Sequence, residues 1–156
     1  MTCFVKAGPE FRVDTRVNGT QTDPAVAALA SGGFVITWTD NTYLLEELGG
    51  ADVRAQIYGA AGERIGGEFL INTETIDHQR DAKIAGLQGG GFVVVWQDFS
   101  GSRGDECGSS IKAKVFGRGG EPVRDEFLVN VETRDSQTDP VVASLPDGGF
   151  VVAWHD

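Results

Sequence analysis

The sequence predicts an all-β protein built from four-stranded antiparallel units that repeat along the chain. Three observations carry this prediction: a glycine pair followed by bulky apolar residues occurs three times, strand-like patterns follow each run, and helix-like patterning is nearly absent. The runs are GGFVITW, GGFVVVW and GGFVVAW, and they end at Trp38, Trp96 and Trp154, which are equally spaced along the chain. Equal spacing over a stretch of this length indicates a tandem repeat.

The repeat register extends well beyond the tryptophans and needs no gaps. The segments EFRVDTRVNGTQTDP, EFLINTETIDHQRDA and EFLVNVETRDSQTDP begin at Glu10, Glu68 and Glu126, with the same spacing as the tryptophans. A chain of 156 residues has the size of one domain. The prediction is therefore a single repeat domain, residues 1–156, with three units: 10–67, 68–125, and 126–156 completed by 1–9.

Within the first unit, four strands are expected, and they form two consecutive hairpins. Residues 25–29 and 34–38 are apolar and flank a glycine-containing turn, which is typical of a hairpin. Residues 53–58 and 68–72 form the next pair, separated by GAAGERIGG, whose glycines suit a turn. The segment TYLLEELGG, residues 42–50, predicts at most one or two helical turns in a loop.

The side-chain pattern of each strand indicates how deeply it is buried. Phe92, Val94 and Trp96 point to one face of the second strand and Val93 and Val95 to the other, so both faces need cover. The third and fourth strands alternate apolar and polar residues, which indicates one wetter face. The expected core residues are the aromatic residues of the three runs: Phe34, Phe92, Phe150, Trp38, Trp96 and Trp154.

Repeating four-stranded units with sandwiched inner strands describe the blades of a β-propeller. The segment CFVKA near the N-terminus resembles IKAKV of the second unit, so it is expected to supply the missing third strand of the last unit. The chain would then hold three blades, and two chains joined head to tail would complete a six-bladed ring as a homodimer. The alternative is a monomeric threefold β-prism or β-trefoil.

Composition excludes several classes of protein. A net charge of -10 opposes binding to a phosphate backbone, so we expect no nucleic-acid partner. No apolar run approaches the roughly 20 residues that cross a bilayer, so we expect no membrane insertion. Two cysteines form no disulfide framework, and the N-terminal residues lack the pattern of a signal peptide.

The sequence offers little for catalysis. The two histidines, His78 and His155, occupy non-equivalent positions of the repeat, and no nucleophile, zinc-binding or phosphate-binding motif occurs. The prediction is that the protein is not an enzyme.

A Q-x-D pattern before the first strand of each unit is the candidate ligand-binding site. An amide and a carboxylate two residues apart on extended backbone point the same way, which suits the hydroxyl pairs of a sugar. The pattern also resembles the start of the mannose-site motif of monocot-type lectins, although Ala25 and Leu29 replace its Asn and Tyr. The alternative is that these side chains bond the backbone of the connection. The candidates are Gln21, Asp23, Gln79, Asp81, Gln137 and Asp139.

One aspartate follows each tryptophan by two residues and is the candidate metal ligand. Asp40, Asp98 and Asp156 stand at the start of the loop after the second strand, where carboxylates can bind calcium. The alternative is that they stabilise the turn. Calcium is thus the one cofactor that the sequence suggests.

The motifs QTDPAVAALASGGFVITW and VRAQIYGAAGERIGGEFLINTET resemble the tandem repeats of large bacterial secreted proteins of the hemolysin-type calcium-binding and adhesin class. The resemblance implies an extracellular or cell-surface location and an adhesive role. We therefore predict a non-enzymatic binding or adhesion module that recognises glycans or surface ligands. The alternative is an architectural, self-assembling repeat fragment with no small-molecule ligand. The expected partners are a second copy of the chain and a glycan.

Overall fold

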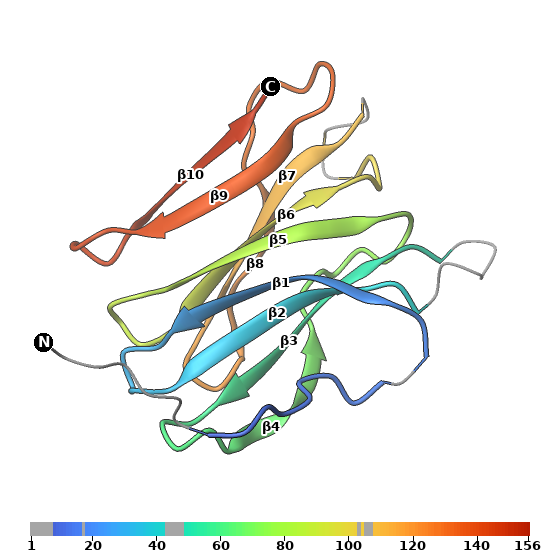
Figure 1. The fold of residues 1–156 in the computed structure, drawn as a ribbon. Helices are drawn as coiled ribbons and strands as arrows, with labels where there is room; N and C mark the ends of the chain where they lie inside the picture. Colours follow the sequence, from blue (N-terminus) through green and yellow to red (C-terminus); the bar gives the residue numbers. More distant parts are fainter. Residues whose placement is uncertain (1–7, 17, 43–48, 103, 105–107) are drawn as a thin grey trace, which may run out of the picture.

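A computed structural model describes residues 8–16, 18–42, 49–102, 104 and 108–156, and in them the chain is all-β. Ten antiparallel strands form two four-stranded sheets and one two-stranded sheet (Figure 1). We call them sheet 1 (β1 to β4), sheet 2 (β5 to β8) and sheet 3 (β9 and β10). The strands are β1 (Gln21–Ala28), β2 (Phe34–Asp40), β3 (Asp52–Tyr58), β4 (Arg64–Leu70), β5 (Gln79–Gly86), β6 (Phe92–Asp98), β7 (Ser110–Phe116), β8 (Pro122–Leu128), β9 (Thr138–Ser144) and β10 (Phe150–His155).

Consecutive strands pair with each other, so each four-stranded sheet is a meander. The first turn of each unit repeats closely: Leu29 N–H donates to the Gly33 carbonyl at 2.8 Å, and Leu87 and Leu145 make the same bond to a glycine four residues on. Gly90, in the second of these turns, has φ +96°, which a glycine adopts without strain. The predicted hairpins are confirmed. Their first strand begins earlier than predicted: β1 covers Gln21–Ala28 instead of residues 25–29, so the Q-x-D pattern of this unit lies on the strand and not before it.

The fourth strand begins earlier than expected. The prediction placed it at residues 68–72, whereas β4 covers Arg64–Leu70. The turn is shorter than its glycines suggested, because Gly59 N–H already donates to the Glu63 carbonyl at 2.9 Å and closes it. Glycines at Gly66 and Gly67 then lie within the strand, where the pairing with β3 is irregular.

Residues 10–14 are the repeat equivalents of the strand predicted at 68–72, so the repeat register predicts a strand there too, and the structure does not bear this out. Residues 8–16 form no strand, but they lie along sheet 1, where the Arg64 guanidinium donates to the carbonyls of Arg12 and Val13, each at 2.9 Å. The Phe11 ring packs against Tyr58 with 5.4 Å between centroids. The expected strand within residues 1–7 lies outside the described residues, as does most of the helical turn expected at 42–50. In the described part of the chain, β9 and β10 pair only with each other.

The three sheets lie in series, with the sheets following one another along the chain (Figure 1). Strand β5 packs beside β1 and β2, and β9 packs beside β5 and β6. Trp96 is fully buried and Trp38 is 4% exposed, whereas Trp154 of sheet 3 is half-buried. Phe92 is buried, and Phe34 and Phe150 are half-buried. Among the described residues no helix is long and apolar enough to cross a membrane.

Candidate functional site

The glutamines of the Q-x-D pattern point into the protein. Gln79 and Gln137 are both 0% exposed, and Gln21 is half-buried. The Gln79 amide donates to the Ile76 carbonyl at 2.9 Å, and Gln137 and Gln21 likewise donate to the carbonyl three residues earlier, at 2.9 and 3.1 Å. In each unit the glutamine therefore closes the connection that leads into the first strand.

The aspartates of the same pattern turn away from the glutamines. Asp23, Asp81 and Asp139 have φ of 52°, 56° and 52°, in the left-handed region. Each coincides with a register shift, in the pairing of β1 with β2, of β5 with β6 and of β9 with β10. The expectation that both side chains point the same way assumed extended backbone, and this backbone is not extended at the aspartate. The Asp139 side chain is largely exposed and lies 3.6 Å from His155 Nδ1.

The aspartates after the tryptophans fall into two groups. Asp40 and Asp98 are buried at the ends of β2 and β6, whereas Asp156 is exposed and accepts a bond from the Gln137 amide at 3.2 Å. Asp98 accepts from Ser100 N–H at 3.0 Å, as a turn-stabilising aspartate does. Within the described residues, no group of three or more His, Cys, Asp or Glu side chains is placed to hold a metal ion.

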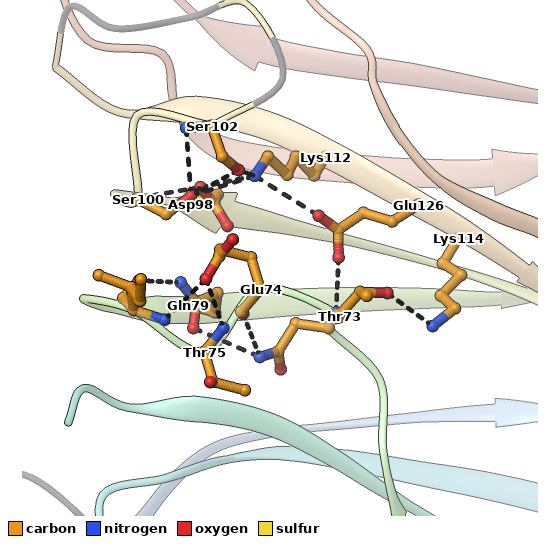
Figure 2. A network of polar contacts seen from close by, with 12 residues as sticks. Thr73, Glu74, Thr75, Gln79, Asp98, Ser100, Ser102, Lys112, Lys114 and Glu126 are labelled. Carbon is orange, nitrogen blue, oxygen red and sulfur yellow. Dashed lines mark hydrogen bonds and ion pairs between the residues drawn. The ribbon is translucent and has the colours of Figure 1, made fainter. Parts of the chain in front are cut away.

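The cation beside Asp98 is a buried lysine. Lys112 of β7 is 0% exposed, and its ammonium lies 2.9 Å from Asp98 Oδ1 and 3.5 Å from Glu126 Oε1 of β8. The same ammonium donates to Ser102 Oγ at 2.6 Å and to Ser100 Oγ at 3.2 Å. Figure 2 shows these groups converging on the lysine nitrogen. A buried ammonium with this set of oxygen partners is well compensated.

Sheet 1 contains the equivalent ionic cluster. Arg54 holds the repeat position of Lys112, one unit earlier, and its Nε lies 3.8 Å from Asp40 and 3.3 Å from Glu68. Arg16 adds a second guanidinium, 3.4 Å from Glu68. We call these sets, Asp40–Arg54–Glu68 and Asp98–Lys112–Glu126, the ionic triads.

Each triad also holds the connection that precedes its sheet. Glu126 accepts a hydrogen bond from Thr73 N–H at 2.7 Å, and Glu68 accepts one from Thr15 N–H at 2.8 Å, at the equivalent position of the unit before. Lys114 of β7 adds a bond to Thr73 Oγ1 at 3.1 Å (Figure 2). It also donates to the Ile71 carbonyl at 3.1 Å. The triad thus fastens three strands of one sheet to the segment arriving from the sheet before.

Two asparagines complete the repeated network. Asn72 Oδ1 accepts from Val53 N–H at 2.8 Å, and its amide donates to Glu74 O at 2.8 Å and to Gln79 Oε1 at 3.3 Å. Asn130 Oδ1 accepts from Ile111 N–H at 2.9 Å, which is the same bond in the next unit. Sequence reasoning overlooked both these residues and the triads. The available signal was a charged or amide residue recurring at the repeat spacing inside otherwise apolar strands.

Asp52 is a buried carboxylate with a raised pKa. Burial raises the pKa of Asp52 above its ordinary value of 3.8, against the lowering effect of the Asn72 amide, which donates to it at 2.7 Å. Above the raised pKa the folded protein carries the cost of a desolvated charge, and this cost is relieved as pH falls through that pKa.

The fold and its contacts define a class: an all-β protein of serially stacked, repeated sheets. Comparison with family models, curated proteins and solved structures gave no match.

Proposed function

We propose that this chain is a non-enzymatic architectural module whose repeated sheets act as a scaffold. One observation carries the proposal: the glutamines and the ionic triads that recur at the repeat spacing are turned inward and join each sheet to the connection before it. Gln79 and Gln137 have no exposed surface to offer a ligand, and Asp98 is engaged by Lys112. Side chains used in this way stabilise the order of the sheets.

The sheets are arranged as propeller blades in this proposal. The first strands of successive sheets, β1, β5 and β9, lie side by side, as the innermost strands of neighbouring blades do. This serial arrangement favours blades over a threefold β-prism or β-trefoil, and a ring of six blades needs two such chains. The resemblance to repeats of secreted bacterial proteins suggests a place outside the cell.

Glycan recognition is the competing proposal, and it predicts a different thermal response. A ligand that binds only the folded state raises the melting temperature, whereas a scaffold without a ligand shows no such rise. Thermal unfolding in the presence of a panel of soluble glycans is expected to leave the melting temperature unchanged. A rise that is lost in Asp81→Ala, with the fold intact, would overturn the architectural proposal.

The scaffold proposal also predicts coupling between sheets. Glu126→Ala removes the acceptor of the Thr73 N–H bond, so amide exchange of the connection between β4 and β5 should speed up, measured by hydrogen exchange with mass spectrometry. Glu121→Ala is the matched control, because Glu121 bonds only within its own turn, at Gly119 N–H, among the contacts described. Equal exchange in the two variants would contradict the coupling.

A further inference from the structure

Each sheet has two faces, and neighbouring sheets pack face to face. We call the face turned to the following sheet the forward face, and the face turned to the preceding sheet the rear face. Between sheets 1 and 2, the forward-face residues Leu29 and Val35 pack in one buried cluster with the rear-face residues Ala82, Val94 and Trp96. The contact is apolar and fully excludes solvent from Val35.

The same interface occurs again between sheets 2 and 3. The forward-face residues Leu87 and Val93 are the repeat equivalents of Leu29 and Val35, and they pack with Val142, Phe150 and Val152 of sheet 3. Apolar residues at the same repeat positions therefore form both interfaces between sheets.

The forward face of sheet 3 is apolar and exposed. Leu145 and Val151 occupy the positions of Leu29 and Val35, yet they are 38% and 51% exposed. Ala143 and Ala153 beside them are exposed as well. In the described residues nothing covers this face, although every equivalent position in sheet 2 is buried or partly buried within a cluster.

The rear face of sheet 1 is the complementary surface. Val26 is 66% exposed, and Phe34 and Ile36 are half-buried. A pocket of about 140 Å³ opens on this face between the N-terminal segment and strands β1 and β2, and Ile36 and Trp38 are part of its wall. The equivalent residues of sheet 2, Val94 and Trp96, stand where Leu29 and Val35 of sheet 1 are packed.

We propose that the forward face of sheet 3 binds the rear face of sheet 1 in a second copy of this chain, head to tail. Leu145 and Val151 of one copy then meet Val26 and Ile36 of the other, reproducing the interface that occurs twice within each chain. The inference rests on the proposed scaffold function and names its partner. A contact between two different faces closes into a ring when its rotation allows and otherwise extends into a fibre.

Charge opposes this association and gives it a salt dependence. The chain carries a net charge of -10, so two copies repel each other at low ionic strength. Salt screens that repulsion, while the apolar contact is little affected. Association should therefore strengthen as sodium chloride rises.

Mass measurement by sedimentation tests the proposal at about 0.1 mM protein, which populates any complex with a lower Kd. The wild-type chain is expected to exceed 16.6 kDa, and to reach twice that mass if two copies close a ring. Val151→Asp and Val26→Asp should each give monomers, because each places a charge on one face. Val131→Asp is the control: Val131 is 95% exposed in the connection after β8, and this variant should still associate.

Mixing the two monomeric variants identifies the geometry. The Val151→Asp chain keeps its rear face and the Val26→Asp chain keeps its forward face, so the mixture should form a dimer that neither forms alone. A monomeric wild type in high salt, persistent association of Val151→Asp, or a mixture that stays monomeric would each overturn the proposal. Circular dichroism confirms the fold of each variant. If the wild type is monomeric but Glu126→Ala speeds up amide exchange in the connection between β4 and β5, only this inference is wrong. If Glu126→Ala and Glu121→Ala exchange equally, the proposed scaffold function is wrong.

Discussion

Replacing the buried lysine of the second ionic triad should severely destabilise the protein. Lys112→Met keeps most of the side-chain volume but removes the ammonium that lies between Asp98 and Glu126, both of which are buried. Two carboxylates then remain out of water without their cation. Breaking a buried ion pair from one side costs about 3–5 kcal/mol.

The expected loss is large compared with the stability of an ordinary domain, which is about 5–15 kcal/mol. For a chain of this length, each kcal/mol lowers the melting temperature by about 2–4 °C, so Lys112→Met should lower it by roughly 6–20 °C. Urea unfolding at pH 7 measures the same difference as a shift of the midpoint without a change of slope.

Lys114→Met is the matched control for this experiment. Lys114 lies on the same strand and carries the same charge, but it is partly exposed and donates only to Ile71 O and Thr73 Oγ1 among the bonds described. Its loss should cost about 1 kcal/mol. The reasoning is refuted if Lys112→Met and Lys114→Met are equally stable, because the ammonium of Lys112 would then contribute no more than a surface charge.

Three further predictions concern Asp52, Gly86 and the candidate calcium ligands. Asp52→Asn removes the carboxyl whose pKa burial raises, so its stability relative to wild type should be higher at pH 7 than at about pH 3, measured by urea unfolding; no change with pH would contradict this. Gly86→Ala should cost about 1–3 kcal/mol, because the added methyl would overlap the Ala28 carbonyl of the preceding sheet, whereas Gly67→Ala meets no atom within 4 Å and should stay within about 0.5 kcal/mol in thermal unfolding. Calcium at millimolar concentration should produce no binding heat in calorimetry, because the aspartates at the ends of β2 and β6 already have basic partners; a saturable heat would show otherwise.

The strands of each unit were predictable because their signals are local. A run such as GGFVVVW fixes a turn and a doubly buried strand together, and Phe92 to Trp96 are indeed buried without exception. The start of β4 was harder to place, since a glycine-rich segment is compatible with either a long turn or an irregular strand. Pairing with β3, a tertiary contact, decided that the strand begins at Arg64.

Local sequence patterns could not predict that Gln79 and Lys112 point into the protein. Alternation on an extended backbone would put Gln79 and Asp81 on one side, but Asp81 adopts left-handed backbone and Gln79 bonds the preceding loop. A lysine is rarely buried unless it is paired, so the alternating pattern of the third strand places Lys112 on the face exposed to solvent. Its two carboxylate partners come from different strands and are recognised only once the sheet is assembled.

The link from each ionic triad to the connection before it makes the stability of the chain depend on copy number. The repeated contacts described above lie within a unit or join it to its immediate neighbour, so the energetics are those of a one-dimensional array. Adding or removing one whole copy of the repeat would create a new interface between sheets with the same kinds of contact as the old one. A change of a few residues in a connection would instead misplace the Thr73 amide that bonds Glu126, so this chain should tolerate the gain or loss of a whole repeat better than that of part of one.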